Sequence, residues 1–238
     1  MECADGGRWP MSGGASGGRV RLEPWEDSAL CLGLLRRVNS PEMTSHLGGP
    51  ESEEQLLVRH RRYAELTGPG AGRMYRVVLP EGDEGDEGHE GDQTAGSIGY
   101  WEREWRGESV YETGWAVLPP FQGRGIAAAA AREVARAAAA QHTHRYLHAY
   151  PSVGHPASNG VCRKAGFTLL GECEFEYPVG TMMRCNDWRL ELWPPSSSPS
   201  LKSGAVRVRP EGARGTARPA TTQPRMNDRT SRHFPRSA

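Results

Sequence analysis

Hydrophobic and polar positions alternate along the chain with two different periods. A period of two predicts strands, at residues 20–22, 74–79, 96–105, 109–118, 146–150, 167–177 and 182–193. A period near 3.6 predicts helices, at residues 27–38, 51–66, 125–141 and 155–165. The elements therefore follow one another in the order β-α-α-β-β-β-α-β-α-β-β.

This order predicts an α/β domain of the α+β type rather than a doubly wound parallel sheet, because helices and strands do not alternate regularly. We expect a mixed, largely antiparallel sheet of about seven strands flanked by four helices. Trp101, Trp105, Trp115 and Trp188 lie on predicted strands. Aromatic residues in such positions usually pack in the core or on a sheet face.

Composition limits how much of the chain can fold. With 30 Gly, 18 Pro and 37% hydrophobic residues among 238, the chain is too polar to form one compact globule over its full length. The Gly- and Ser-rich residues 1–18 predict a disordered leader, and the Pro-, Ser- and Arg-rich residues 194–238 predict a disordered tail. The folded domain is then expected at residues 19–193. Within it, the acidic, glycine-rich residues 81–92 lack EF-hand spacing and predict a solvated hairpin loop rather than a cation site.

Charge excludes some partners. The 29 basic and 29 acidic residues cancel, so no overall field attracts nucleic acid or an anionic membrane. The tail is nevertheless basic, with nine Lys or Arg against two acidic residues in 201–238. Weak RNA contact is one interpretation of this tail, and a solvated extension is the one we favour. No apolar run approaches about 20 residues, and the N-terminus lacks a signal-peptide pattern. We therefore expect a cytoplasmic protein with no membrane partner. We also expect a monomer or homodimer with no specific nucleic-acid partner.

The five cysteines are widely separated and form no CxxC pair. This spacing predicts reduced thiols and no metal site.

The most informative segment joins a predicted strand to a predicted helix through Pro119-Pro120 and two glycines, Gly123 and Gly125. A helix N-terminus presents unpaired N–H groups to an anion. The glycines leave room for a phosphate to approach the backbone. The segment contains neither a phosphate loop of the GxxxxGK[ST] type nor a GxGxxG fingerprint. It therefore favours a cofactor with a pyrophosphate group, and a glycine-rich turn without a ligand is the alternative.

The six residues 122–127, Gln-Gly-Arg-Gly-Ile-Ala, match the Q/R-x-x-G-x-G/A pattern of the GNAT acetyltransferases. Residues 98–101, 111–115, 156–167 and 183–189 resemble the RimJ/RimL-like branch of that superfamily, in the same order. The resemblance covers residues 19–193. It implies a GNAT fold with a splayed strand pair, and acetyl-coenzyme A as cosubstrate without a metal.

The resemblance also implies a set of cofactor-binding residues. The backbone of Val117 would bind the acetyl-pantetheine arm, the loop would bind the pyrophosphate, and one serine matches the coenzyme-contacting pattern of the following helix. The full set is Val117, Gln122, Gly123, Arg124, Gly125, Ile126, Ala127 and Ser158.

The implied reaction is transfer of an acetyl group to a primary amine by direct attack in a ternary complex. The acceptor would be a protein N-terminus or a small-molecule amine. Something must accept the proton of the amine, and Glu112 is our candidate, on the strand five positions before Val117. The alternative role for Glu112 is that of a strand-surface carboxylate that orders a neighbour by hydrogen bonding.

Two positions depart from the family pattern. Cys162 stands where many members have a tyrosine that protonates the departing thiolate. This cysteine could donate a proton, but we expect it to pack in the core. His155 stands where the branch usually has asparagine; it could contact pantetheine, act as a base or be a partly exposed residue near a helix start. These departures keep open a non-catalytic acyl-coenzyme A sensor as the alternative function.

Overall fold

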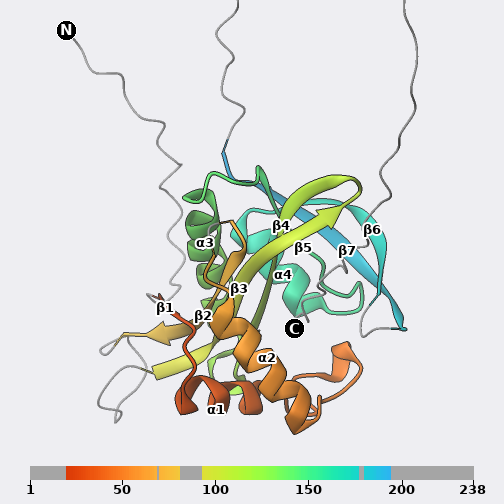
Figure 1. Cartoon of the computed structure of the whole chain (residues 1–238). Coiled ribbons are helices and arrows are strands. Elements are labelled where there is room, and N and C mark those ends of the chain that lie inside the picture. The colour runs from red at the N-terminus through yellow and green to blue at the C-terminus, as the bar shows by residue number, and fades with distance from the viewer. Residues whose placement is uncertain (1–19, 69, 81–92, 177–179, 194–238) are drawn as a thin grey trace, which may run out of the picture. The chain divides into compact units, whose positions relative to one another are not determined.

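The computed structural model describes residues 20–68, 70–80, 93–176 and 180–193 (Figure 1). The predicted leader, the acidic loop and the basic tail lie outside these residues, so they stay predictions.

All seven predicted strands and all four predicted helices are present in the predicted order. The strands are β1 (Arg21–Pro24), β2 (Gly72–Leu79), β3 (Gln93–Trp105), β4 (Glu108–Val117), β5 (Tyr146–Ala149), β6 (Thr168–Glu176) and β7 (Met182–Glu191). The helices are α1 (Ala29–Val38), α2 (Glu53–Glu65), α3 (Ile126–Ala139) and α4 (Pro156–Ala165).

Serine caps explain where the first two helices begin. Ser28 accepts a hydrogen bond from the backbone N–H of Cys31 at the start of α1. Ser52 and Gln55 form a reciprocal capping box at the start of α2. Each cap satisfies N–H groups that a helix N-terminus otherwise leaves unpaired.

The strands form one sheet in the order β1-β2-β3-β4-β5-β7-β6. Every neighbouring pair is antiparallel except β4 and β5, which are parallel. These two strands are in register at only two positions, where Tyr111 lies opposite Leu147 and Glu112 opposite His148. Because β4 continues to Val117, the strands diverge beyond that point. The predicted largely antiparallel sheet and its splayed pair are both confirmed.

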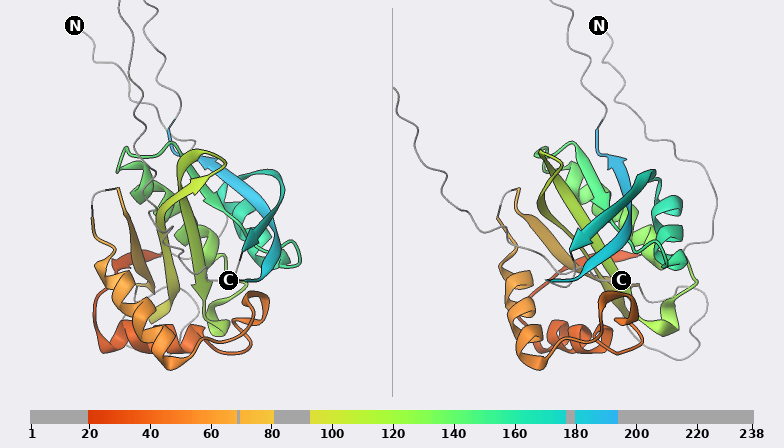
Figure 2. Two further views of the ribbon diagram at one scale, coloured as in Figure 1. Left: turned by 45° about the vertical axis from the view of Figure 1, so that its right-hand side comes forward. Right: turned by 90° about the vertical axis from the view of Figure 1, so that its right-hand side faces the viewer.

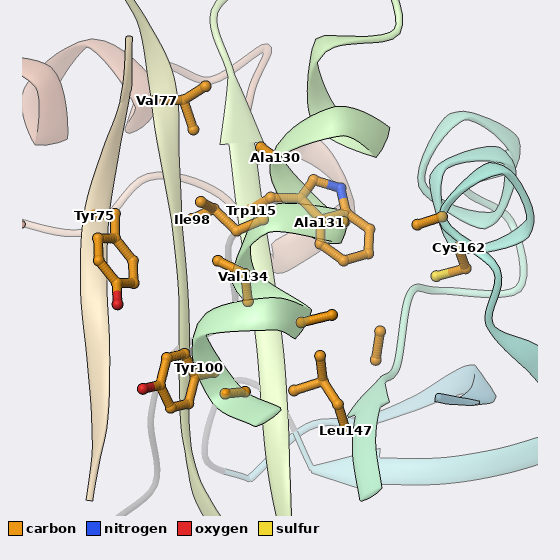
Figure 3. Close-up of a cluster of buried hydrophobic side chains, with 14 of the residues drawn as sticks. Tyr75, Val77, Ile98, Tyr100, Trp115, Ala130, Ala131, Val134, Leu147 and Cys162 are labelled. Carbon is orange, nitrogen blue, oxygen red and sulfur yellow. The ribbon is translucent and has the colours of Figure 1, made fainter. Parts of the chain in front are cut away.

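Helices cover both faces of the sheet (Figure 2). On one face, α3 and α4 pack on a cluster that includes Ile98, Trp115 and Leu147, shown in Figure 3. On the other face, α1 and α2 pack on a second cluster around Leu35 and Leu118. A third and smaller cluster joins β5, β6 and β7; its members are Tyr150, Phe175 and Cys185, with Trp105, Cys173 and Met183 packed against them.

The expected role of the tryptophans is confirmed for three of them. Trp101, Trp115 and Trp188 are each at most 5% exposed. Trp105 is only partly buried and packs against the third cluster.

Candidate active site

A groove with a volume of about 550 Å³ runs along the N-termini of α3 and α4 and reaches the end of β4. Its lining includes seven of the eight predicted cofactor-binding residues, namely Val117, Gln122, Gly123, Gly125, Ile126, Ala127 and Ser158. The eighth, Arg124, lies beside the groove with its guanidinium 5.9 Å from the centre of the Phe121 ring. Part of the segment between α1 and α2, including Glu42 and His46, forms another wall.

The two helix N-termini give this groove a positive electrostatic potential. In the described part of the chain, neither α3 nor α4 has a side-chain cap or an acidic residue in its first turn. The first backbone N–H groups of α3, and those of α4 after Pro156, therefore have no side-chain cap as acceptor and lie at the positive ends of the helix dipoles. Lys164 from α4 also lines the groove. An anionic group is the ligand that this arrangement suits.

Backbone conformation explains the two glycines of the loop. Gly123 has a φ of +75° and Gly125, which precedes α3, has a φ of +78°. Residues with side chains rarely adopt this left-handed conformation. A Cβ at Gly123 would meet no atom within 4 Å, so the turn itself requires glycine there. The side-chain amide of Gln122 donates a 2.8 Å hydrogen bond to the carbonyl oxygen of Val117 and ties this loop to the end of β4.

A small cavity of about 30 Å³ continues the groove into the gap between β4 and β5. Thr113 lines it from β4 and Tyr150 from the end of β5. The groove and the cavity share four lining residues, which are His46, Trp115, His155 and Ser158. The groove and the cavity therefore adjoin at the gap between the two strands.

Two histidines lie where the groove meets the cavity. The rings of His46 and His155 are stacked, with their centres 4.3 Å apart and an angle of 28° between the planes. Burial lowers the pKa of His155 below its ordinary value, and the nearby His46 lowers it further. A histidine with a lowered pKa is neutral at neutral pH, so its ring can accept a proton.

Glu112 is fully buried and bound to a basic residue. Its Oε2 accepts a hydrogen bond of 2.6 Å from Nη1 of Arg103. The guanidinium of Arg103 in turn lies 4.0 Å from the centre of the Phe175 ring. Glu112 is not among the residues that line the groove or the cavity. The carboxylate therefore orders a neighbour from a buried position, and the expectation of a surface carboxylate is wrong because Glu112 lies inside the sheet. Its predicted role as proton acceptor stays a prediction.

A second buried polar pair next to Glu112 was not predicted from the sequence. Nδ1 of His148 lies 2.8 Å from Oδ1 of Asp187, and the indole N–H of Trp105 donates to Oδ2 of Asp187 at 2.9 Å. Burial alone would raise the pKa of Asp187, but the hydrogen bonds from His148 and Trp105 lower it below its ordinary value. These residues come from three strands, so only the strand register could have revealed the pair.

Cys162 is fully buried in the cluster beneath α3 and α4. Figure 3 shows its side chain pointing from α4 toward the space occupied by Trp115 and Leu147. The expectation that Cys162 packs in the core is confirmed.

Two further observations concern the described residues only. They include no group of three or more His, Cys, Asp or Glu side chains placed to hold a metal ion. None of their helices is both long and apolar enough to cross a membrane.

This fold and groove are those of an acyl-group transferase of the GNAT type. The family model described as "Acetyltransferase (GNAT) domain" matches residues 19–168. The chain therefore belongs to the GNAT acetyltransferase family, and acetyl transfer is its class of reaction. No curated protein matches the sequence.

Solved structures of low sequence identity share the fold. A GNAT-family acetyltransferase from Bacillus anthracis has a TM-score of 0.56 and 15% identity, over 74% of this chain and 96% of that one. Spermidine N-acetyltransferase from Vibrio cholerae, in complex with CoA and spermine, has a TM-score of 0.56 and 14% identity, over 73% and 95%. An acetyltransferase from Salmonella typhimurium that modifies the N-terminal serine of ribosomal protein L7/L12 has a TM-score of 0.54 and 20% identity, over 72% and 94%.

Proposed function

We propose that this protein transfers the acetyl group of acetyl-coenzyme A to a primary amine by direct attack in a ternary complex. The observation that carries the proposal is the continuous path from two helix N-termini, through the groove, into the gap between β4 and β5. A pyrophosphate suits the first part of this path and a thin pantetheine arm suits the second. The similar enzymes from V. cholerae and S. typhimurium act on a polyamine and on a protein N-terminus, and an acceptor of either kind is consistent with the proposal.

In this proposal the pyrophosphate binds the backbone N–H groups of residues 123–127, with Arg124 at the edge of the groove. Ser158 contacts the coenzyme from α4. The backbone of Val117, at the diverging end of β4, hydrogen-bonds the acetyl-pantetheine arm. Donors in this position also stabilise the oxyanion that forms when the amine nitrogen attacks the thioester carbonyl.

The reaction forms a C–N bond, breaks the C–S bond and releases one proton from the amine. Two groups are candidates to accept that proton. Glu112 is the candidate from the sequence, and Arg103 competes for its carboxylate. His155 is the second candidate, because its ring lines both the groove and the cavity. The pH profile of kcat separates them, since Glu112→Gln or His155→Asn removes the acidic limb, the rise of kcat with pH, only when the substituted group is the base.

Calorimetric titration with acetyl-coenzyme A tests the binding part of the proposal. Wild-type protein should bind with micromolar affinity, and a Gly123→Glu/Gly125→Glu variant should lose binding because it places two carboxylates at the anion site. Gly107→Glu is the matched control, since Gly107 also has a positive φ (+81°) and open space around it but lies in the turn between β3 and β4. Absence of wild-type binding, or equal loss in the control, would contradict the proposal.

The alternative is a non-catalytic acyl-coenzyme A sensor. The burial of Cys162 favours it, because the residue at the usual general-acid position is enclosed in the core. A screen of amines for release of free coenzyme A thiol distinguishes the two functions. Binding without thiol release for any amine identifies a sensor, whereas turnover with one amine identifies the enzyme and its acceptor.

A further inference from the structure

Two cysteines that line neither the groove nor the cavity lie directly opposite each other on neighbouring strands. Cys173 of β6 and Cys185 of β7 are register partners in an antiparallel pair. Residues opposite each other in such a pair point to the same side of the sheet, with Cα atoms about 4.5–5.5 Å apart. A disulfide requires a Cα separation of about 4.4–6.8 Å. The register alone therefore places the two thiols within bridging range.

Packing supports the same conclusion. Cys185 belongs to the third cluster, and Cys173 packs against that cluster from the edge of the sheet. Both side chains therefore face one common environment, beside Tyr150 and Phe175. Cys31 and Cys162 belong to the other two clusters. Among the residues that the structure describes, Cys173 and Cys185 are thus the cysteines that share a cluster.

The two cysteines differ in access to solvent. Cys185 is fully buried, whereas Cys173 is partly exposed on the edge strand β6. A soluble reagent therefore reaches Cys173 before Cys185. Cys173 can therefore act as the accessible thiol that attacks the reagent, and Cys185 as the enclosed second thiol beside it.

We propose that Cys173 and Cys185 are a thiol pair that a low-molecular-weight disulfide oxidises to an intramolecular disulfide. The thiolate of Cys173 attacks the reagent RSSR, which forms a mixed disulfide and releases one RS⁻. The thiolate of Cys185 then attacks Sγ of Cys173 and releases the second RS⁻. The two cysteines are oxidised, two molecules of RSH form once the thiolates are protonated, and the strands of the β6–β7 hairpin become covalently joined.

The bond would form close to the Glu112–Arg103 pair. Phe175 lies two residues after Cys173 and stacks on Arg103, and Met183 lies two residues before Cys185 and lines the cavity between β4 and β5. The groove along α3 and α4 includes no residue of β6 or β7. Oxidation therefore constrains the wall beside the cavity and leaves the groove unchanged.

Oxidised glutathione is the probe for this proposal, with the full chain in a Cys3→Ser background to remove the thiol outside the described residues. We expect the free thiol count to fall by two per chain and the intact mass to fall by two hydrogens. Peptide mapping should show a bond between Cys173 and Cys185, and dithiothreitol should reverse it. Affinity for coenzyme A should change by less than about two-fold.

Single variants test the order of the two steps. Cys185→Ser should stop at a stable glutathione adduct on Cys173, and Cys173→Ser should not react. A lasting glutathione adduct on wild-type Cys173, a disulfide between other cysteines, or an unchanged thiol count would overturn the proposal. Thiol counting and mass do not depend on catalysis, so failure of this proposal is distinct from failure of the acetyltransferase assay.

Discussion

Substitutions in the buried pair of Glu112 and Arg103 can separate what Glu112 contributes to stability from what it contributes to catalysis. The Glu112 side chain is 0% exposed and that of Arg103 is 18% exposed. Removing one member of a buried ion pair costs about 3–5 kcal/mol. Because Arg103 keeps some contact with solvent, we expect Glu112→Ala to cost about 3 kcal/mol. Glu112→Gln retains an oxygen that accepts from Arg103, so its cost should be smaller, about 2 kcal/mol.

The reciprocal variant is Arg103→Met, which retains an apolar stem against Phe175 and removes the guanidinium. It leaves the fully buried carboxylate without that ion pair, so its cost should equal or exceed that of Glu112→Ala. The double variant Glu112→Gln/Arg103→Met should lose less than the sum of the single losses, by about 1–3 kcal/mol. Denaturant midpoints followed by tryptophan fluorescence measure each value. A loss below about 1 kcal/mol in Arg103→Met would refute the buried ion pair.

The same variants decide what Glu112 does in the reaction. If it accepts the amine proton, Glu112→Gln should lower kcat by about 10²–10⁴-fold, whereas Arg103→Met keeps the carboxylate and should lower kcat far less. If Glu112 only positions Arg103, Glu112→Gln should lower kcat no more than Arg103→Met does, because the amide oxygen still accepts from Arg103, and the shape of the pH profile should stay unchanged. An unchanged kcat and pH profile in Glu112→Gln would exclude Glu112 as the proton acceptor.

Three further changes test the fold and the site. Gly96→Ala would place a Cβ 2.0 Å from the carbonyl oxygen of Ala116, so its denaturant midpoint should indicate a loss of about 3 kcal/mol in the free energy of unfolding. Gly33→Ala, in open space on α1, should instead raise that free energy by about 0.5–1 kcal/mol. Equal effects of the two substitutions would contradict this account. Asn159→Ala removes four hydrogen bonds of a buried side chain, and its melting temperature should indicate a loss of about 3 kcal/mol in the free energy of unfolding. A near-neutral result would mean that these bonds do not form. The pKa of His155 is lowered by burial and by a neighbouring histidine, so the folded state binds fewer protons than the unfolded state as the pH falls below about 6.5. The free energy of unfolding should then fall between pH 8 and pH 5 in wild type and fall less in His155→Asn. An equal fall in the two proteins would contradict the lowered pKa of His155.

The fold could be predicted because each element has a clear local signal. The alternation in residues 109–118 and the Ala-rich stretch after Gly125 gave β4 and α3 with small errors at the ends. One such error has a physical cause: the helix prediction began at Gly125, whereas its φ of +78° makes it the residue before α3. Most residues of the family pattern lie together along the groove because the loop and the first turn of α3 are contiguous in sequence; their role in binding a cofactor stays a prediction.

Contacts between distant strands could not be predicted in the same way. β7 lies between β5 and β6, so the strand order does not follow the chain. His148 and Asp187 meet only because β7 pairs with β5. Cys173 and Cys185 lie on consecutive strands, and it is the register of the β6–β7 pair that places them opposite each other. Alternation indicates which residues share a face of one strand, but it does not indicate which residue of another strand lies opposite.

The pairing of β7 with β5 also accounts for the gap between β4 and β5. β4 stays bound to β3 to its end, where Gly96 lies opposite Val117 and the backbone N–H of Leu118 donates to Ala95. Residues 151–153, which follow β5, bind β7 instead: the N–H of Val153 donates to Arg184, and the carbonyl oxygen of Pro151 accepts from Asn186.

Asn159 fixes that divergence from the side of α4. Its amide nitrogen donates to the carbonyl oxygens of Ser152 and His155, and its oxygen accepts from the side chains of Asn186 and Trp188. The segment that follows β5 is therefore held against β7 and α4 and not against β4. A pantetheine arm would then enter an opening that the fold maintains, and its binding energy would not be spent on separating two paired strands.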